Sequence, residues 1–383
     1  MELKRACVRS LLVIAAVFVI PLGIWGWSLA APALSYTAAG SAALSLGRSG
    51  LSVSPSPAST GTGLLMYAPV SEGCRDIEAA PTEIQVIRRE PVGIEAAKPS
   101  EEVLALEPYP EDQNQHSGRI EKTHYGPYDN PQFFDLEGGG QVRNGTYYTN
   151  SQLLQQSRMP PDFSMDYSEG EPLVLIYHTH ATESYEPSDR DFYDSSFKSK
   201  TTDPTKSVIE VGNRICAELE KAGIPYIHDT LVHDLPSYND AYDSSRKTVK
   251  ELLEKYPSIR IVLDIHRDGI QKEDGTRIAP VAEIEGREAA QIMIISGCDN
   301  GSMGMPDHLK NFHFACALQS ELETLFPTLT RPILFDYRHY NQDLTTGSLL
   351  IEVGSHGNCL DQAFYSGELI GKGLASLIMD NKE

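Results

Sequence analysis

A short apolar run that ends abruptly in ionisable side chains is the most informative pattern in the chain. Residues 173–177 read L-V-L-I-Y, which predicts a buried strand. The run is followed directly by His178 and His180, and three residues later by Glu183. Packing does not require imidazoles and a carboxylate here, and ligands bind at the carboxyl ends of strands in open parallel α/β sheets. This strand end is therefore a candidate functional site.

Two later runs follow the same pattern. Residues 259–265, I-R-I-V-L-D-I, are followed by His266 and Arg267, and residues 349–354, L-L-I-E-V-G, contain Glu352 between apolar neighbours. A carboxylate in an apolar run is costly to bury unless it is paired or functional. If the three runs form neighbouring parallel strands, their ionisable side chains converge at one edge of the sheet.

Strand and helix patterns alternate through residues 167–383, which predicts one folded domain. Apolar residues recur at helical spacing in residues 207–222, 238–256, 312–325 and 360–379. Further short apolar runs lie at residues 224–228, 279–285, 291–296 and 332–337. The alternation predicts an α/β fold with a mostly parallel sheet flanked by helices.

The N-terminal region differs in composition from this domain. Residues 1–9 are basic and residues 10–33 are apolar and uncharged, which predicts a single-pass transmembrane helix with a cytoplasmic N-terminus and an extracytoplasmic domain. Small residues near residue 30 also fit a cleaved signal peptide, although the length of the run favours an uncleaved anchor. Residues 34–166 are rich in Ser, Gly, Pro, Glu and Gln, which predicts a largely disordered stalk with local elements such as residues 82–88.

Charge and cysteine content narrow the possible partners. The 383 residues carry a formal net charge of -21 and no basic cluster, which excludes nucleic acid as a partner. The six cysteines are scattered without a C-x-x-C pair, so we expect mostly free or buried thiols and no cysteine-rich metal site.

The side chains at the strand ends are those of a catalytic zinc site. Such sites take three ligands from His, Glu or Asp and leave one position for water. His180, Glu183 and His266 are the candidate ligands, and Glu352 is the candidate general base for amide hydrolysis. His178 competes with His180 for the ligand role, because the two cannot easily reach one ion unless the strand ends between them.

Structural interpretations of the same residues stay open. The His-Thr-His segment fits a hydrogen-bonded pair, and residues 264–268, D-I-H-R-D, fit a buried ion-pair network. Arg267, Arg338 and Asn341 are candidates for contact with a substrate, the last two in the polar segment Y-R-H-Y-N-Q-D-L.

Four ordered motifs resemble those of the stage II sporulation protein P family of endospore-forming bacteria. They are Y-H-T-H-A-T-E-S-Y (177–185), L-D-I-H-R-D (263–268), Y-N-Q-D-L (340–344) and L-L-I-E-V-G (349–354). The resemblance implies a fold related to zinc-dependent N-acetylmuramoyl-L-alanine amidases. It also implies amidase and endopeptidase activity on peptidoglycan at the septal and engulfing membranes, together with stage II sporulation proteins D and M.

The resemblance implies residue roles as well. In the amidases a His ends the first strand, a second His ends a later strand, and a Glu near the C-terminus is the base; these match His180, His266 and Glu352. The amidases' carboxylate ligand opens the first helix, where this chain offers only Glu210 well inside the helix, so Glu183 takes its place. A metal-dependent polysaccharide deacetylase or phosphoesterase, and a non-catalytic wall-binding scaffold, remain alternatives.

Overall fold

The computed structural model describes residues 85–87, 115–168, 170–197, 199–235 and 237–382. The predicted anchor, residues 10–33, and most of the stalk before residue 115 lie outside this part of the chain. Within the described ranges, no helix combines the length and the apolar character needed to cross a bilayer.

The described elements follow one another in the order expected for an α/β protein. The helices are α4 (Asn150–Gln156), η2 (Pro204–Lys206, 3-10), α5 (Val208–Lys221), α6 (Ala241–Lys255), α7 (His308–Leu325) and α8 (Leu360–Asp380). The strands are β1 (Gln85–Ile87), β2 (Gly118–Thr123), β3 (Phe133–Asp135), β4 (Gln141–Asn144), β5 (Val174–Tyr177), β6 (Phe192–Tyr193), β7 (Tyr226–His228), β8 (Ile261–Asp268), β9 (Arg277–Ile284), β10 (Arg287–Ala290), β11 (Ile292–Gly297), β12 (Ile333–Asp336) and β13 (Gly347–Ser355).

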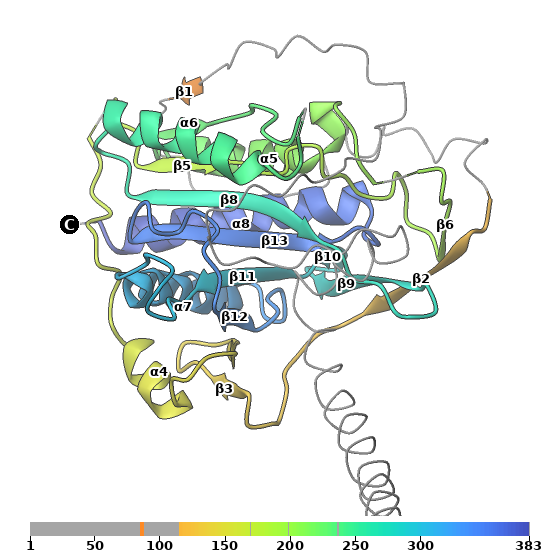
Figure 1. The fold of residues 1–383 in the computed structure, drawn as a ribbon, viewed down its shortest axis with the longest axis horizontal. Coiled ribbons are helices and arrows are strands. Elements are labelled where there is room, and N and C mark those ends of the chain that lie inside the picture. Colours follow the sequence, from red (N-terminus) through yellow and green to blue (C-terminus); the bar gives the residue numbers. More distant parts are fainter. Residues whose placement is uncertain (1–84, 88–114, 169, 198, 236, 383) are drawn as a thin grey trace, which may run out of the picture. The chain divides into compact units, whose positions relative to one another are not determined.

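A large mixed sheet forms the centre, with strand order β1-β7-β5-β8-β13-β11-β12-β4-β3 (Figure 1). The four neighbouring strands β7, β5, β8 and β13 are mutually parallel, and so are β11, β12 and β4. However, β11 runs antiparallel to β13, and β1 and β3 are antiparallel edge strands. The α/β class is confirmed, but the prediction of a mostly parallel sheet is wrong. Every residue from β8 to β11 is described and no helix intervenes, so the chain lacks the usual crossover that would return β11 in the parallel direction.

The two faces of the large sheet carry different helices. Leu263, Ile265 and Ile351 point into the main core, together with apolar residues of α5, α7 and α8. Val262 and Tyr177 point to the opposite face and pack with Val249 and Leu252 of α6. Because side chains alternate along a strand, this parity assigns His266 and Glu352 to the α6 face.

Residues 115–166, predicted to be part of the stalk, are folded, and this part of the prediction is wrong. They form β2, β3, β4 and α4. Strand β2, G-R-I-E-K-T, buries only Ile120, so its hydrophobic signal is too weak to stand out. It belongs to a small second sheet with the order β10-β9-β2-β6. The four described cysteines are buried and free, as expected: Cys216, Cys298, Cys316 and Cys359.

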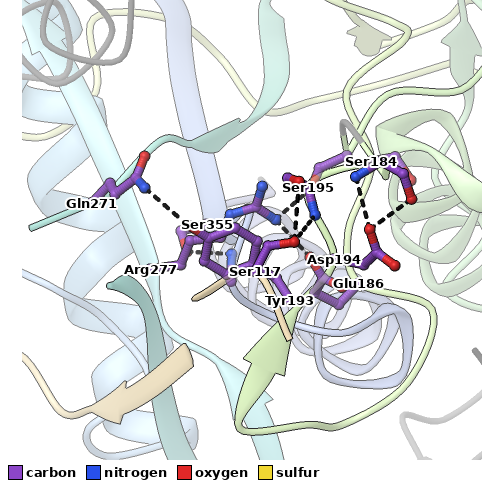
Figure 2. A network of polar contacts seen from close by, with 12 residues as sticks. Ser117, Ser184, Glu186, Tyr193, Asp194, Ser195, Gln271, Arg277 and Ser355 are labelled. Carbon is purple, nitrogen blue, oxygen red and sulfur yellow. Dashed lines mark hydrogen bonds and ion pairs between the residues drawn. The ribbon is translucent and has the colours of Figure 1, made fainter. Parts of the chain in front are cut away.

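A polar network joins this small sheet to the segment that follows β5 (Figure 2). Arg277 of β9 donates from Nη1 to Glu186 Oε1 over 2.7 Å, and Glu186 is 1% exposed. The guanidinium lies 3.8 Å from the ring centroid of Tyr193 in β6. The backbone N–H of Glu186 donates to the carbonyl oxygen of Asn358. Both the backbone and the side chain of Glu186 are therefore fixed, three residues after Glu183.

Replacing Arg277 with Met should lower the free energy of unfolding by about 3–5 kcal/mol, because the buried Glu186 carboxylate would lose the guanidinium that pairs with it. Chemical denaturation measures this. The control is Lys122→Met, which removes only exposed ion pairs with Asp189 and Glu288 and should cost less than about 1 kcal/mol. Equal losses in the two variants would contradict a special contribution from the Arg277 pair.

Candidate metal centre

Two of the predicted site residues are direct neighbours in the sheet. His266 of β8 and Glu352 of β13 are register partners in a parallel pair, and both are buried on the α6 face. Strand β5 lies on the other side of β8, with Tyr177 opposite Asp264. His180 and Glu183 follow the carboxyl end of β5, and the sheet thereby brings all four side chains to one edge.

Three of these side chains present ligand atoms to a common point. One ligand atom from each of His180, Glu183 and His266 can be chosen so that all lie within 4.8 Å of one another. His180 Nδ1 lies 3.9 Å from Glu183 Oε1, and His266 Nδ1 lies 3.5 Å from Glu183 Oε2. Ligand bonds of about 2.0–2.2 Å in tetrahedral zinc sites require separations of roughly this size. Two imidazoles and a carboxylate are also ligand types that zinc takes, so the residues fit the ion.

Local contacts fix the carboxylate of Glu183. Its backbone N–H donates to the carbonyl oxygen of His180 over 3.0 Å, which closes a turn directly after β5. Its Oε2 accepts the backbone N–H of Arg267 over 3.1 Å. Burial alone would raise the pKa of Glu183, but His266 and Arg267 together lower it far below its ordinary value. The group is thus held as a carboxylate, the form that binds a metal.

Asp264 orients His266. Its Oδ1 lies 2.9 Å from His266 Nε2, and its two oxygens accept the backbone N–H and the hydroxyl of Thr179 over 2.8 and 2.7 Å. Burial lowers the pKa of His266, but Asp264 and Glu183 outweigh it and raise this pKa well above its ordinary value. A positive charge is therefore favoured between two carboxylates, and a metal cation would take the place of the proton. A carboxylate behind a histidine ligand is frequent at zinc sites.

Glu352 is a buried carboxylate with an unused oxygen. It is 6% exposed, and no described residue offers a hydrogen bond to its Oε2. Burial, and secondly the charge of Asp268, raise its pKa to about 8, whereas His266 lowers it. A carboxyl group with a pKa near neutrality can both accept and donate a proton at physiological pH.

His178 lies on the opposite face of the sheet from His180. Its Nδ1 is 3.1 Å from the carbonyl oxygen of Ile265, and its Nε2 is 2.8 Å from Nε2 of His228. A Cβ added at Gly212 of α5 would come within 2.8 Å of His178, so the two imidazoles fill the space beneath that helix. Burial lowers the pKa of His178 to about 3. The pair is neutral and structural, and it joins His178 to His228 rather than to His180.

Comparison with known proteins shows which family the chain belongs to. The family model described as "Stage II sporulation protein P (SpoIIP)" matches residues 82–375. The chain belongs to this family. It is 30% identical over 207 residues to Stage II sporulation protein P of Bacillus subtilis (strain 168), a match that covers 50% of this chain and 47% of that protein. The chain thus matches about half the length of this curated relative.

Solved structures similar to this SpoIIP family member include two N-acetylmuramoyl-L-alanine amidases. AmiC2 of Nostoc punctiforme is 14% identical with a TM-score of 0.32, covering 56% of this chain and 98% of that one. The amidase of Clostridium difficile 630 is 15% identical with a TM-score of 0.33, covering 56% and 100%. Since these identities and TM-scores are low, the chemistry of the site rests on its own residues.

Aromatic residues that sequence reasoning missed surround the histidines. Tyr238 stacks on His180 with ring centroids 4.0 Å apart and an interplanar angle of 13°. Tyr242 contacts both His180 and His266, and Tyr340 stacks on Tyr242 at 5.5 Å. Tyr242 lies in the first turn of α6, whereas Tyr238 precedes that helix by three residues, so no single helical face marked the two tyrosines in the sequence.

The residues predicted to contact substrate are engaged within the protein. The guanidinium of Arg267 donates to the carbonyl oxygens of Ser184 and Ser199, which holds the loop after Glu183 against β8. Asn341 donates to the carbonyl oxygen of Tyr242 and thus ties its loop to α6. Arg338 lies 3.4 Å from Asp336. Contact of these three with substrate stays a prediction.

We expect His180→Asn to weaken zinc affinity by more than about 100-fold, because it removes one of the three converging donors. His178→Asn should leave zinc affinity within about 10-fold, since that side chain faces α5. Equilibrium dialysis with metal analysis measures both, and circular dichroism checks that each variant is folded. Loss of zinc only in the His178 variant would contradict the assignment of His180 as a ligand and would point to His178 instead.

The stability of the zinc-free protein should fall as pH rises from about 4.5 to about 8 through the Glu352 contribution. The folded-state pKa is raised, so the folded chain holds a proton that the unfolded chain, with an ordinary pKa of 4.5, has already released. The loss can reach about 5 kcal/mol as an upper bound. It is measured as the difference between wild type and Glu352→Gln in denaturation at pH 5 and pH 9. A difference that does not change with pH would refute the raised pKa.

Proposed function

We propose that this protein is a zinc-dependent peptidoglycan hydrolase, which cleaves the amide between N-acetylmuramic acid and L-alanine and also cuts stem-peptide cross-links. The observation that carries the proposal is the convergence of His180, Glu183 and His266 beside Glu352. Two histidines and one glutamate are the ligand set of well-known zinc peptidases. Membership of the stage II sporulation protein P family supports a role at the cell wall during sporulation.

The protein's own residues divide the work of such a reaction. His180, Glu183 and His266 would hold the ion, which when bound would supply a water of lowered pKa and a positive charge for the substrate carbonyl. Glu352 accepts the proton of the attacking water and returns it to the leaving amine, for which its near-neutral pKa is suited. Asp264 keeps His266 oriented through both steps.

The protein would act at the cell membrane. Residues 10–33, which lie outside the described residues, would anchor it in the membrane with the N-terminus in the cytoplasm and the folded domain outside. There it would act on the peptidoglycan of the septal and engulfing membranes with stage II sporulation proteins D and M. Family resemblance supports these two partners.

Purified protein loaded with zinc should release peptides from isolated peptidoglycan sacculi. Glu352→Gln should keep zinc but lose more than about 100-fold in rate, and His266→Asn should lose zinc and activity together. Product analysis by mass spectrometry distinguishes muramoyl-amide cleavage from cross-link cleavage. Metal content is measured on the same samples.

The matched control is Glu210→Gln. Glu210 lies in α5, where its Oε1 pairs with Arg214 Nη2 at 2.7 Å, and this variant should keep both zinc and activity. Release of acetate or phosphate without peptides would instead favour a deacetylase or a phosphoesterase. Binding of sacculi without any release by the zinc-loaded wild type would favour a scaffold.

A further inference from the structure

The side chain of Lys200 emerges next to the candidate metal centre. Residues 199–201 pair with residues 182–184, since Ser184 donates its N–H to Ser199 O and Thr201 donates its N–H to Thr182 O. Lys200 is therefore directly opposite Glu183 in an antiparallel bridge. Directly opposed residues of an antiparallel pair project to the same side. Lys200 and the carboxylate of Glu183 thus share one side of this short ladder.

Tyr238 holds the ammonium group at the rim of the centre. Lys200 Nζ lies 4.1 Å from the centroid of the Tyr238 ring. The imidazole of His180 is stacked on the same ring, 4.0 Å away and nearly parallel, so it occupies one face and the ammonium occupies the other. Lys200 is exposed, and Tyr238 is 44% exposed. A molecule that approaches His180 from solvent therefore meets this pair.

The other cationic side chains around the centre already bind groups within the protein. Arg267 donates to backbone carbonyl oxygens, and Arg331 is paired with Asp268 at 3.0 Å. In contrast, no described residue forms an ion pair with Lys200, although the carboxylates of Glu183 and Asp234 lie near enough to act on its charge. The chain as a whole carries a net charge of -21, which repels anions at long range. An anionic substrate would need a local cation, and Lys200 is placed to supply it.

We propose that Lys200, supported by the ring of Tyr238, binds a carboxylate of the peptide substrate close to the scissile amide and so selects acidic stem peptides. This inference rests on the proposed function and adds the substrate preference of the same site. The second residue of a stem peptide is a γ-linked D-glutamate, whose α-carboxyl group is either a free carboxylate or an amidated, neutral carboxamide. Lys200 distinguishes these two forms by charge.

The test uses two synthetic muramoyl peptides that differ only in this carboxylate or carboxamide. The zinc-loaded wild type should cleave the carboxylate form with a kcat/KM about 10-fold higher, mainly through KM, as one charge-assisted contact would give. Lys200→Met should abolish the preference with unchanged zinc content, and Lys200→Arg should restore most of it. The control Lys206→Met removes a lysine of the same segment that is paired with Asp203, and it should retain the preference.

Equilibrium binding separates this inference from the proposed function. The same two peptides are titrated into zinc-loaded Glu352→Gln and Glu352→Gln/Lys200→Met proteins, with calorimetry as the readout. Tighter binding of the carboxylate form that depends on Lys200 supports the inference, whether or not the wild type cleaves either peptide. Equal affinity for the two peptides, or a preference that persists in the Lys200→Met background, overturns it. Absence of cleavage in the wild type counts against the proposed hydrolase alone.

Discussion

The structure depends on one buried carboxylate, Asp264, at the centre of the sheet edge that carries the site. An ionised carboxylate is costly to bury unless donors surround it. Asp264 accepts the backbone N–H and the hydroxyl of Thr179, and its Oδ1 lies against His266. These contacts fix the end of β5 relative to β8, and they set the distance between His180 and His266. The requirement to satisfy one charge therefore brings together two imidazoles that are 86 positions apart in the sequence.

The mixed sheet gives Glu352 its unusual environment. Its neighbour on one side is His266 in the parallel strand β8, and its neighbour on the other side is Met293 in the antiparallel strand β11. Because β11 enters in the reverse direction, its apolar beginning lies beside the carboxyl end of β13. Glu352 thus has a polar side, facing the candidate metal ligands, and an apolar side that contributes to its burial. This combination explains a pKa raised by burial in a group that remains next to charged partners.

Much of the fold could be predicted from the sequence because its signals are local. Apolar runs and helical periodicity located the strands and helices around the site. His178 and His180 diverge because β5 ends at Tyr177 and the chain then turns. The direction of β11 could not be predicted, since it depends on the missing crossover after β8. Strand β2 was not predicted because it has only one buried position and is stabilised by its partners in the second sheet. Tyr238 and Lys200 reach the site only through tertiary contacts, which no spacing encodes.

The choice between Glu183 and Glu210 as the carboxylate ligand follows from packing. The expectation that Glu210 lies well inside the helix is wrong, since it lies in the first turn of α5, but there it pairs with Arg214 of the same helix. Glu183 instead follows β5 within one turn. There the chain is hydrogen-bonded to Ser199 and Thr201 on one side, and the Glu183 carboxylate accepts the backbone N–H of Arg267 on the other. A ligand in a turn lacks the repeating hydrogen bonds that hold a helical residue, so such a position needs external support. The Arg277–Glu186 pair and the small second sheet supply that support, which gives residues 115–123 and 277–290 a role in shaping a centre that they do not themselves enter.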